Sequence, residues 1–287
     1  MVLIRSKVVV YALAPVSHTL KLVKLAAYRT ATNPLSISVT PATKTSPALI
    51  AVADLMKSVS ILVLVPPPPN TGLSWALTES ARHFATMWSS SVSAIGDNEW
   101  VAADMEGNLI LVRRNINGVT EDDRKRLEVT SELRLGEIVN SIVPVRVRDE
   151  NVLTMRGRGS STTTNPNAAA DLPVGPVITP RAFLATVEGG VYMLGTISAE
   201  HQDLLMRLQQ AVAARTKGLG YMPWAKYRAF KNEVREADEA FRFVDGELVE
   251  GFLNFSQEDM ADVVGELGVG VDVERVKGMV EGLKRLH

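Results

Sequence analysis

Four histidines are the side chains of this sequence best suited to act as bases or metal ligands near neutral pH. They are His18, His83, His201 and His287, and they lie far apart, with no carboxylate or second histidine at a spacing that suits a shared metal ion. The sequence contains no cysteine, which excludes disulfides, zinc-thiolate sites and cysteine nucleophiles. We therefore expect surface or capping roles for the histidines, with no metal and no cofactor.

Two glycine-containing segments could be mistaken for phosphate-binding loops. Residues 156–159 (Arg-Gly-Arg-Gly) and 268–270 (Gly-Val-Gly) lack the lysine and Ser/Thr of a P-loop, and neither lies between a strand and a helix. No serine lies in a nucleophile elbow. The residues thus support neither a catalytic site nor a small-molecule substrate, and we expect a protein that is not an enzyme.

The composition is that of a soluble globular protein, with 46% hydrophobic and 22% charged residues over 287 positions. A formal net charge of -1 predicts no general attraction to nucleic acid or to anionic lipid. The most apolar stretch, residues 47–65, contains Asp54 and Lys57, so we predict no membrane-spanning segment. The absence of cysteine favours a reducing compartment.

Three segments share one pattern: an apolar strand, an acidic residue, a turn of three or four residues and a second apolar strand. These segments are residues 49–64, 100–112 and 183–195, with Asp54, Asp104 and Glu188 as the acidic residues. The turn glycines Gly107 and Gly189 suit tight hairpins because they adopt positive φ at little cost. The first two thirds of the chain are therefore predicted to be antiparallel β-structure.

A further β-rich stretch precedes each hairpin, at residues 36–40, 91–95 and 140–145. Three or four antiparallel strands per unit are typical of propeller blades, although a β-sandwich with accidental similarity is the alternative. Residues 7–13 would add a leading strand. About three blades cannot close a propeller, so we expect a fragment of a longer protein or a truncated gene model.

The chain changes character after Gly195, where helical signals replace the strands. We expect helices capped or opened by Ser198, Pro223, Asp245, Ser256 and Asp272. Residues 146–180 are rich in polar residues, glycine and proline, which predicts a disordered insertion between strands. The expected fold class is mainly β with a C-terminal α domain: an incomplete β-propeller over residues 1–197 and a helical domain over residues 198–287.

Four segments of the sequence resemble the C-terminal third of proteins in the cleavage-and-polyadenylation-specificity-factor (CPSF) A subunit family. The segments are residues 54–59, 81–88, 135–140 and 243–253. The similarity runs from about residue 7 to the end, with fungal-type insertions around Pro66 and over residues 146–180. The Val-Asp-Gly-Glu-Leu-Val-Glu sequence at 244–250 favours the branch that binds UV-damaged DNA over the RNA-processing branches.

The resemblance implies a non-enzymatic scaffold that acts in DNA-damage recognition and repair. In the damage-binding branch, the full-length protein is the adaptor of a cullin-type ubiquitin ligase and holds substrate receptors, many of them WD40 proteins. The resemblance also implies a nuclear and cytoplasmic location, and it leaves open an indirect contact with damaged DNA. The alternative is a nucleic-acid-binding subunit of a polyadenylation or splicing complex.

The resemblance places the partner-binding face on six residues, which are Tyr11, Leu55, Met56, Lys57, Arg82 and Trp88. An arginine, a tryptophan and a methionine on one rim are residue types that anchor interfaces. Lys57 replaces the arginine of the family, so a bidentate contact is not expected there. The alternative for Trp88 is burial in the core, because it precedes a strand.

Overall fold

The computed structural model describes residues 2–3, 6–16, 19–44, 46–70, 74–145, 177–268 and 271–286. The chain divides into two compact units, each built from separate stretches of sequence. The first contains Met1–Pro144, Phe183–Tyr192 and Arg228–Arg242, and the second contains Val145–Ala182, Met193–Tyr227 and Phe243–His287. The expected insertion falls mostly on residues 146–176, outside the described residues, and strand β13 already begins at Ile178.

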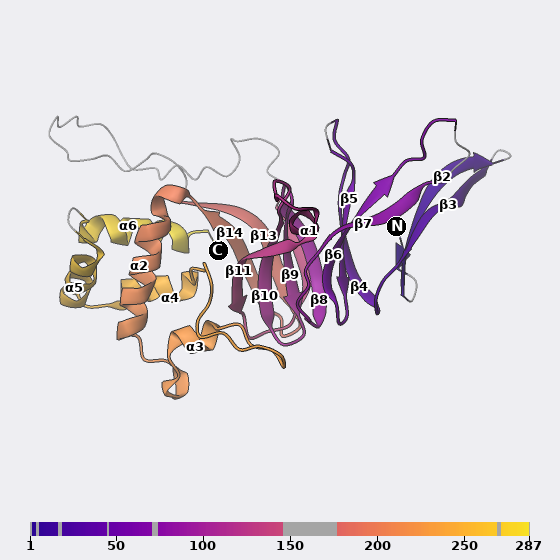
Figure 1. Cartoon of the computed structure of the whole chain (residues 1–287). Coiled ribbons are helices and arrows are strands. Elements are labelled where there is room, and N and C mark those ends of the chain that lie inside the picture. The colour runs from indigo at the N-terminus through magenta and orange to yellow at the C-terminus, as the bar shows by residue number, and fades with distance from the viewer. Residues whose placement is uncertain are drawn as a thin grey trace, which may run out of the picture. The chain divides into compact units, whose positions relative to one another are not determined.

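Within the described residues, the strands form four antiparallel sheets, none of them closed (Figure 1). The first sheet contains β1 (Val2–Leu3), β2 (Lys7–Val16) and β3 (Thr19–Arg29). The second contains β4 (Pro34–Thr40), β5 (Leu49–Asp54), β6 (Ser58–Val65) and β7 (Ala76–Arg82). The third contains β8 (Ser89–Gly96), β9 (Glu99–Asp104), β10 (Asn108–Arg114) and β11 (Leu127–Arg134). The fourth contains β12 (Val139–Pro144), β13 (Ile178–Thr186) and β14 (Val191–Ile197).

The second and third sheets have the blade-like arrangement that the repeat predicts. Each has four strands in which neighbours along the chain are hydrogen-bonded neighbours in the sheet. The hairpins β5–β6 and β9–β10 coincide with the first two repeated segments, and β13 and β14 with the third. The predicted fold class, mainly β followed by helices, is confirmed.

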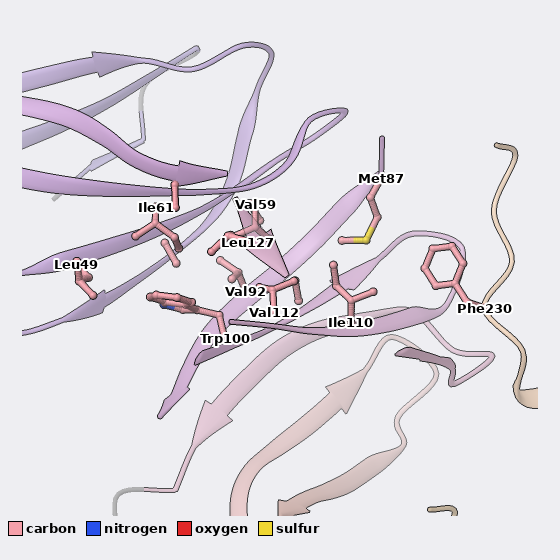
Figure 2. Close-up of a cluster of buried hydrophobic side chains, with 14 residues drawn as sticks. Leu49, Val59, Ile61, Met87, Val92, Trp100, Ile110, Val112, Leu127 and Phe230 are labelled. Carbon is pink, nitrogen blue, oxygen red and sulfur yellow. The ribbon is translucent and has the colours of Figure 1, made fainter. Parts of the chain in front are cut away.

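One of the two apolar clusters of the first unit lies between these two sheets. Figure 2 shows Trp100 of β9 packed among apolar side chains that come from both, including Leu49, Ile61 and Val92. Alternate residues along β9 and β10 contribute to this cluster, because side chains of a strand point to opposite faces in turn. Met87, which precedes β8, belongs to the same core.

One contributor to this core comes from far along the chain. Arg228–Arg242, which we call the return segment, belongs to the first unit although it follows a long helix. Its Phe230 is only 4% exposed and packs in the cluster of Trp100. The helical character expected throughout residues 198–287 is thus interrupted, and the predicted boundary between residues 197 and 198 remains a proposal.

The helices outside the return segment follow the predicted caps closely. They are α2 (Ala199–Arg215), α3 (Trp224–Arg228), α4 (Gly246–Glu250), α5 (Gln257–Leu267) and α6 (Val273–Lys284), with 3₁₀ turns η1 (Leu219–Tyr221) and η2 (Gly251–Asn254). Asp245 and Ser256 accept hydrogen bonds from the backbone of their first turns, as N-caps do. Ser198 occupies the N-cap position of α2, but its hydroxyl instead bonds to Nδ1 of His201.

The second unit has its own apolar core. Side chains from α2, α5 and α6, among them Leu205, Leu208, Val263 and Val280, surround Phe252 of η2. No helix among the described residues is long and apolar enough to cross a membrane. The sequence did not predict the five-residue helix α1 (Glu121–Lys125), where Thr120 and Asp123 form a reciprocal capping box.

Candidate partner-binding rim

The turn between β5 and β6 carries three of the six predicted site residues. Buried Asp54 holds this turn, because its carboxylate accepts hydrogen bonds from the backbone N–H of Thr32 at 2.9 Å and from the Thr32 hydroxyl. The backbone N–H of Leu55 donates to the Asn33 carbonyl at 2.8 Å. With its backbone fixed in this way, the turn presents the Met56 side chain, which is 44% exposed, to solvent beside Lys57.

A buried carboxylate that accepts hydrogen bonds also holds the turn between β9 and β10. Asp104 is fully buried and accepts hydrogen bonds from the backbone N–H groups of Glu106 and Asn108, at 2.9 and 2.8 Å. Burial raises the pKa of Asp104 above its usual value, and the bonds from Asn108 offset part of that rise. The acidic residue of the repeat therefore has a structural role in both sheets.

The third turn departs from this pattern. Glu188 is exposed in the turn and does not take the place of Asp54 or Asp104. The carboxylate near this hairpin is Glu137, which accepts hydrogen bonds from the Thr186 hydroxyl at 2.6 Å and the Tyr192 hydroxyl at 2.8 Å. These two bonds hold the pKa of Glu137 below its usual value.

Trp88 stands at the surface, with 41% of the residue exposed. Its carbonyl accepts a hydrogen bond at 2.8 Å from the backbone N–H of Met105, the first residue of the second turn. The core tryptophan of this region is Trp100, so the alternative of a buried Trp88 does not hold. This backbone contact joins Trp88 and Met105, two exposed large apolar residues from segments that are separate in sequence.

Arg82, at the end of β7, forms contacts with other side chains of the protein. Its guanidinium donates to Glu79 at 2.6 Å, and the Tyr28 hydroxyl donates to the same carboxylate oxygen at 2.5 Å. Burial alone would lower the pKa of Arg82, but the hydrogen bond and charge of Glu79 outweigh it and raise that pKa. Burial and the Glu79 bond raise the pKa of Tyr28 to about 12. Lys57 lines the same small cavity as Arg82 and Tyr28.

The segment that precedes Trp88 contacts the first turn through His83. The backbone N–H of His83 donates to the Val59 carbonyl at 2.9 Å, and the His83 ring bonds to the Ser58 hydroxyl at 2.7 Å. Burial, followed by the charge of Arg235, lowers the pKa of His83 to about 4, although Glu132 acts in the opposite direction. His83 is therefore a neutral structural residue at physiological pH.

Tyr11 lies in the first sheet, to which none of the other five predicted residues belongs. It is half-buried on β2, opposite Lys24 of β3 and next to a register shift after Val10. Within the described residues, no hydrogen bond joins Tyr11 to the other five. We call the remaining five the turn-end rim, namely Leu55, Met56, Lys57, Arg82 and Trp88.

Sequence reasoning missed several exposed side chains beside this rim. Phe84 is exposed, with the Arg126 guanidinium 5.7 Å from its ring centre, and Met105 is exposed in the second turn. Met105 occupies the position in its repeat that Leu55 occupies in the first, so aligning the repeats would have found it. Phe84 offered no comparable signal.

The return segment reaches this neighbourhood from the far end of the chain. The Asn232 side chain donates to the Thr86 carbonyl at 3.4 Å, and the backbone N–H of Glu233 donates to the Glu106 carboxylate at 3.1 Å. The adjacent Val234 is 74% exposed. Apolar side chains with cations beside them can bind a protein surface. The described residues include no cluster of three or more side chains that could hold a metal ion.

Comparison with known proteins gives consistent matches. The family model of the CPSF A subunit region matches residues 1–254. DNA damage-binding protein 1a of Arabidopsis thaliana is 34% identical over 238 residues, which cover 83% of this chain and 19% of that protein. DNA damage-binding protein 1 of Oryza sativa subsp. japonica is 33% identical over 245 residues, covering 85% and 20%. The protein of the same name from Solanum lycopersicum is 33% identical over 238 residues, covering 83% and 19%.

The chain spans about a fifth of the length of these curated relatives. The region of similarity includes both hairpin turns and the return segment, because the family model extends to residue 254.

Proposed function

The chain belongs to the CPSF A subunit family, and from this premise we propose that it is a non-enzymatic protein-interaction scaffold of the DNA damage-binding type. In this proposal the chain is part of the adaptor of a cullin-type ubiquitin ligase that acts in DNA-damage recognition and repair, in the nucleus and cytoplasm. Its partners are WD40-type substrate receptors, the cullin is held through the full-length protein, and contact with damaged DNA is indirect. The names of the relatives do not favour the RNA-processing alternative.

The observation that best supports this proposal is the exposure of large apolar side chains at the hairpin turns. Trp88, Met56 and Met105 stand on backbone that buried carboxylates and interstrand hydrogen bonds fix in place. A rigid tryptophan loses little conformational entropy on binding, and a flexible methionine adapts its shape to a partner surface. We assign the receptor contact to the turn-end rim and keep Tyr11 as a separate contact.

The test is Trp88→Ala in a chimera in which this chain replaces the matched region of a full-length DNA damage-binding protein 1. We expect receptor binding to weaken about thirtyfold, because a central interface anchor contributes about 2 kcal/mol or more. The melting temperature should change little, since Trp88 is 41% exposed. Pull-down of WD40 receptors and a thermal melt measure the two effects.

Trp75→Ala is the matched control. Trp75 is similarly exposed but lies just before β7 begins, at the opposite end of that strand from Arg82. It should leave receptor binding unchanged. A folded Trp88→Ala chimera that captures receptors as well as its parent would refute the assignment of the rim, and a parent chimera that captures no receptor would refute the proposed function.

A further inference from the structure

A second site candidate lies on the side of the first unit, away from the hairpin turns. It is an open pocket of about 400 Å³ between β6 and β7 on one side and the end of β10 with α1 on the other. Its lining residues are Val63, Thr78, Glu79, Ser80, Arg114, Glu121, Arg124 and Lys125. Three cations and two hydroxyls thus surround a space that could admit a small polar group.

Both carboxylates of this pocket are already paired. Glu79 accepts hydrogen bonds from Arg82 and Tyr28, and Glu121 pairs with Lys125 at 2.6 Å. Their negative charge is therefore largely compensated without the other two cations.

Arg114 and Arg124 form no ion pair among the described residues, although the charge of Arg124 also acts on Glu121 and Asp123. Within the described part of the chain, no carboxylate forms an ion pair with either side chain, and Arg124 donates only one long hydrogen bond, at 3.4 Å, to the Gly118 carbonyl. The Nε of Arg114 is buried and has no hydrogen-bond partner. Burial lowers the pKa of Arg114 below its usual value.

Arg114 is half-buried, but its buried Nε without a hydrogen-bond partner is unfavourable, and an anion that enters the pocket would remove that cost. Because Glu79 pairs with Arg82, the three cations of the lining face one remaining carboxylate, that of Glu121, and this excess of two positive charges matches a dianion better than a monoanion. A phosphate monoester carries a charge of about −1.5 to −2 at neutral pH and three acceptor oxygens, which suit a guanidinium fork and hydroxyl donors. A carboxylate or a phosphodiester carries one charge and would leave one cation uncompensated.

We propose that the pocket lined by Arg114, Arg124, Thr78 and Ser80 binds a phosphate monoester, either as a free small molecule or on a phosphorylated protein side chain. In this arrangement Arg114 forms the bidentate contact, Arg124 supplies the second positive charge, and the two hydroxyls donate to the remaining oxygens. None of the residues that line the site belongs to the turn-end rim, although Glu79 in its lining pairs with Arg82 of that rim.

Calorimetric titration of the full chain tests the proposal with three probes: free phosphoserine, a short phosphoserine peptide and a single-stranded oligonucleotide. We expect both phosphoserine probes to bind, the unphosphorylated peptide not to bind, and the oligonucleotide to bind more weakly. Tighter binding of the peptide than of the free amino acid identifies a protein side chain as the source, and equal binding identifies a small molecule.

The decisive variant is Arg114→Gln, and Arg113→Gln is its control. Arg113 is the neighbour of Arg114 on β10 but does not line the pocket, and it pairs with Glu99. Arg114→Gln should weaken phosphoserine binding about tenfold or more, and Arg113→Gln should change it less than twofold. Equal losses in both variants, preference for the oligonucleotide, or no phosphoserine binding at millimolar concentration would each overturn the proposal.

The melting temperature of Arg114→Met gives a second readout. If Arg114 had a purely structural role, this substitution would lower the melting temperature. Arg114→Met removes a half-buried charge that forms no ion pair, so the melting temperature of the free protein should stay the same or rise. Added phosphoserine should stabilise the parent chain but not this variant. A large loss of stability in Arg114→Met would show that the arginine serves the fold.

Discussion

Trp88 and Trp100 illustrate how different two tryptophans of one sheet region can be. Trp100 is fully buried between the second and third sheets, whereas Trp88 precedes β8 and is held at the surface by its neighbour in the second turn. The sequence left core burial of Trp88 open, because a tryptophan before a strand suits either position. The choice depends on the contact with Met105, which is distant in sequence.

His83 provides a residue-scale prediction about pH. Its pKa of about 4 in the folded protein lies below the usual value near 6.5, so the unfolded chain binds a proton first as pH falls. Stability should be full above about pH 6.5, fall between pH 6.5 and 4, and change no further from this residue below pH 4. The loss should reach at most about 3 kcal/mol.

Denaturant unfolding at several pH values measures this effect. His83→Asn cannot titrate, so its stability should depend less on pH between 6.5 and 4 than that of the parent chain. Parallel pH profiles for the two proteins would contradict the role of His83.

The residue-level predictions succeeded where the local sequence determines the structure, and they did not reach contacts between residues that are distant in sequence. The exposed turn at Met56 followed from the strand–acid–turn pattern. The engagement of Arg82 by Glu79 and Tyr28 did not, because Tyr28 lies on β3, a strand whose pairing with its neighbours the pattern does not reveal. The resemblance alone likewise did not reveal that Tyr11 lies in a different sheet from the other five residues.

At the scale of elements, hairpins and helix caps were predictable and the return segment was not. The helices after Ser198 begin where capping residues precede apolar periodicity, and both are local signals. Arg228–Arg242 has no periodic pattern, and it is held by contacts with β10 and β11. Glu132 forms two hydrogen bonds to Arg235, at 2.9 and 2.5 Å, and pairs its backbone with Phe241.

Phe230 is the residue through which this segment contributes most to stability. Phe230→Ala should destabilise the chain by about 3–5 kcal/mol, because the side chain is buried in the core and also stacks under the Arg235 guanidinium. Val234→Ala, in the same segment but exposed, should cost less than about 0.5 kcal/mol. Chemical denaturation measures both, and similar effects of the two substitutions would show that the segment is not part of the core.

At the scale of the whole chain, the described residues form three apolar clusters, two in the first unit and one in the second, and the units do not follow the sequence order. Trp100 is in the core of the first unit and Phe252 in that of the second. Composition and periodicity predicted that helices would follow the strands. They did not predict the tertiary contacts that place residues 228–242 in the first unit.

Core substitutions should therefore act unit by unit. Trp100→Ala and Phe252→Ala should each cost about 3–5 kcal/mol. Hydrogen exchange should show lost protection mainly in β5 to β11 and the return segment for Trp100→Ala, and mainly in α2, α5 and α6 for Phe252→Ala. Uniform loss of protection over the chain in either variant would contradict this assignment.

The return segment also has a consequence for synthesis on the ribosome. Lys231 pairs its backbone with the Asn108 side chain across a sequence separation of 123 residues. At about 5–20 residues per second, the ribosome needs roughly 6–25 seconds to make the chain between them. For that interval the nascent sheets have emerged without Phe230 to complete their core, and that apolar gap is a surface that chaperones can recognise.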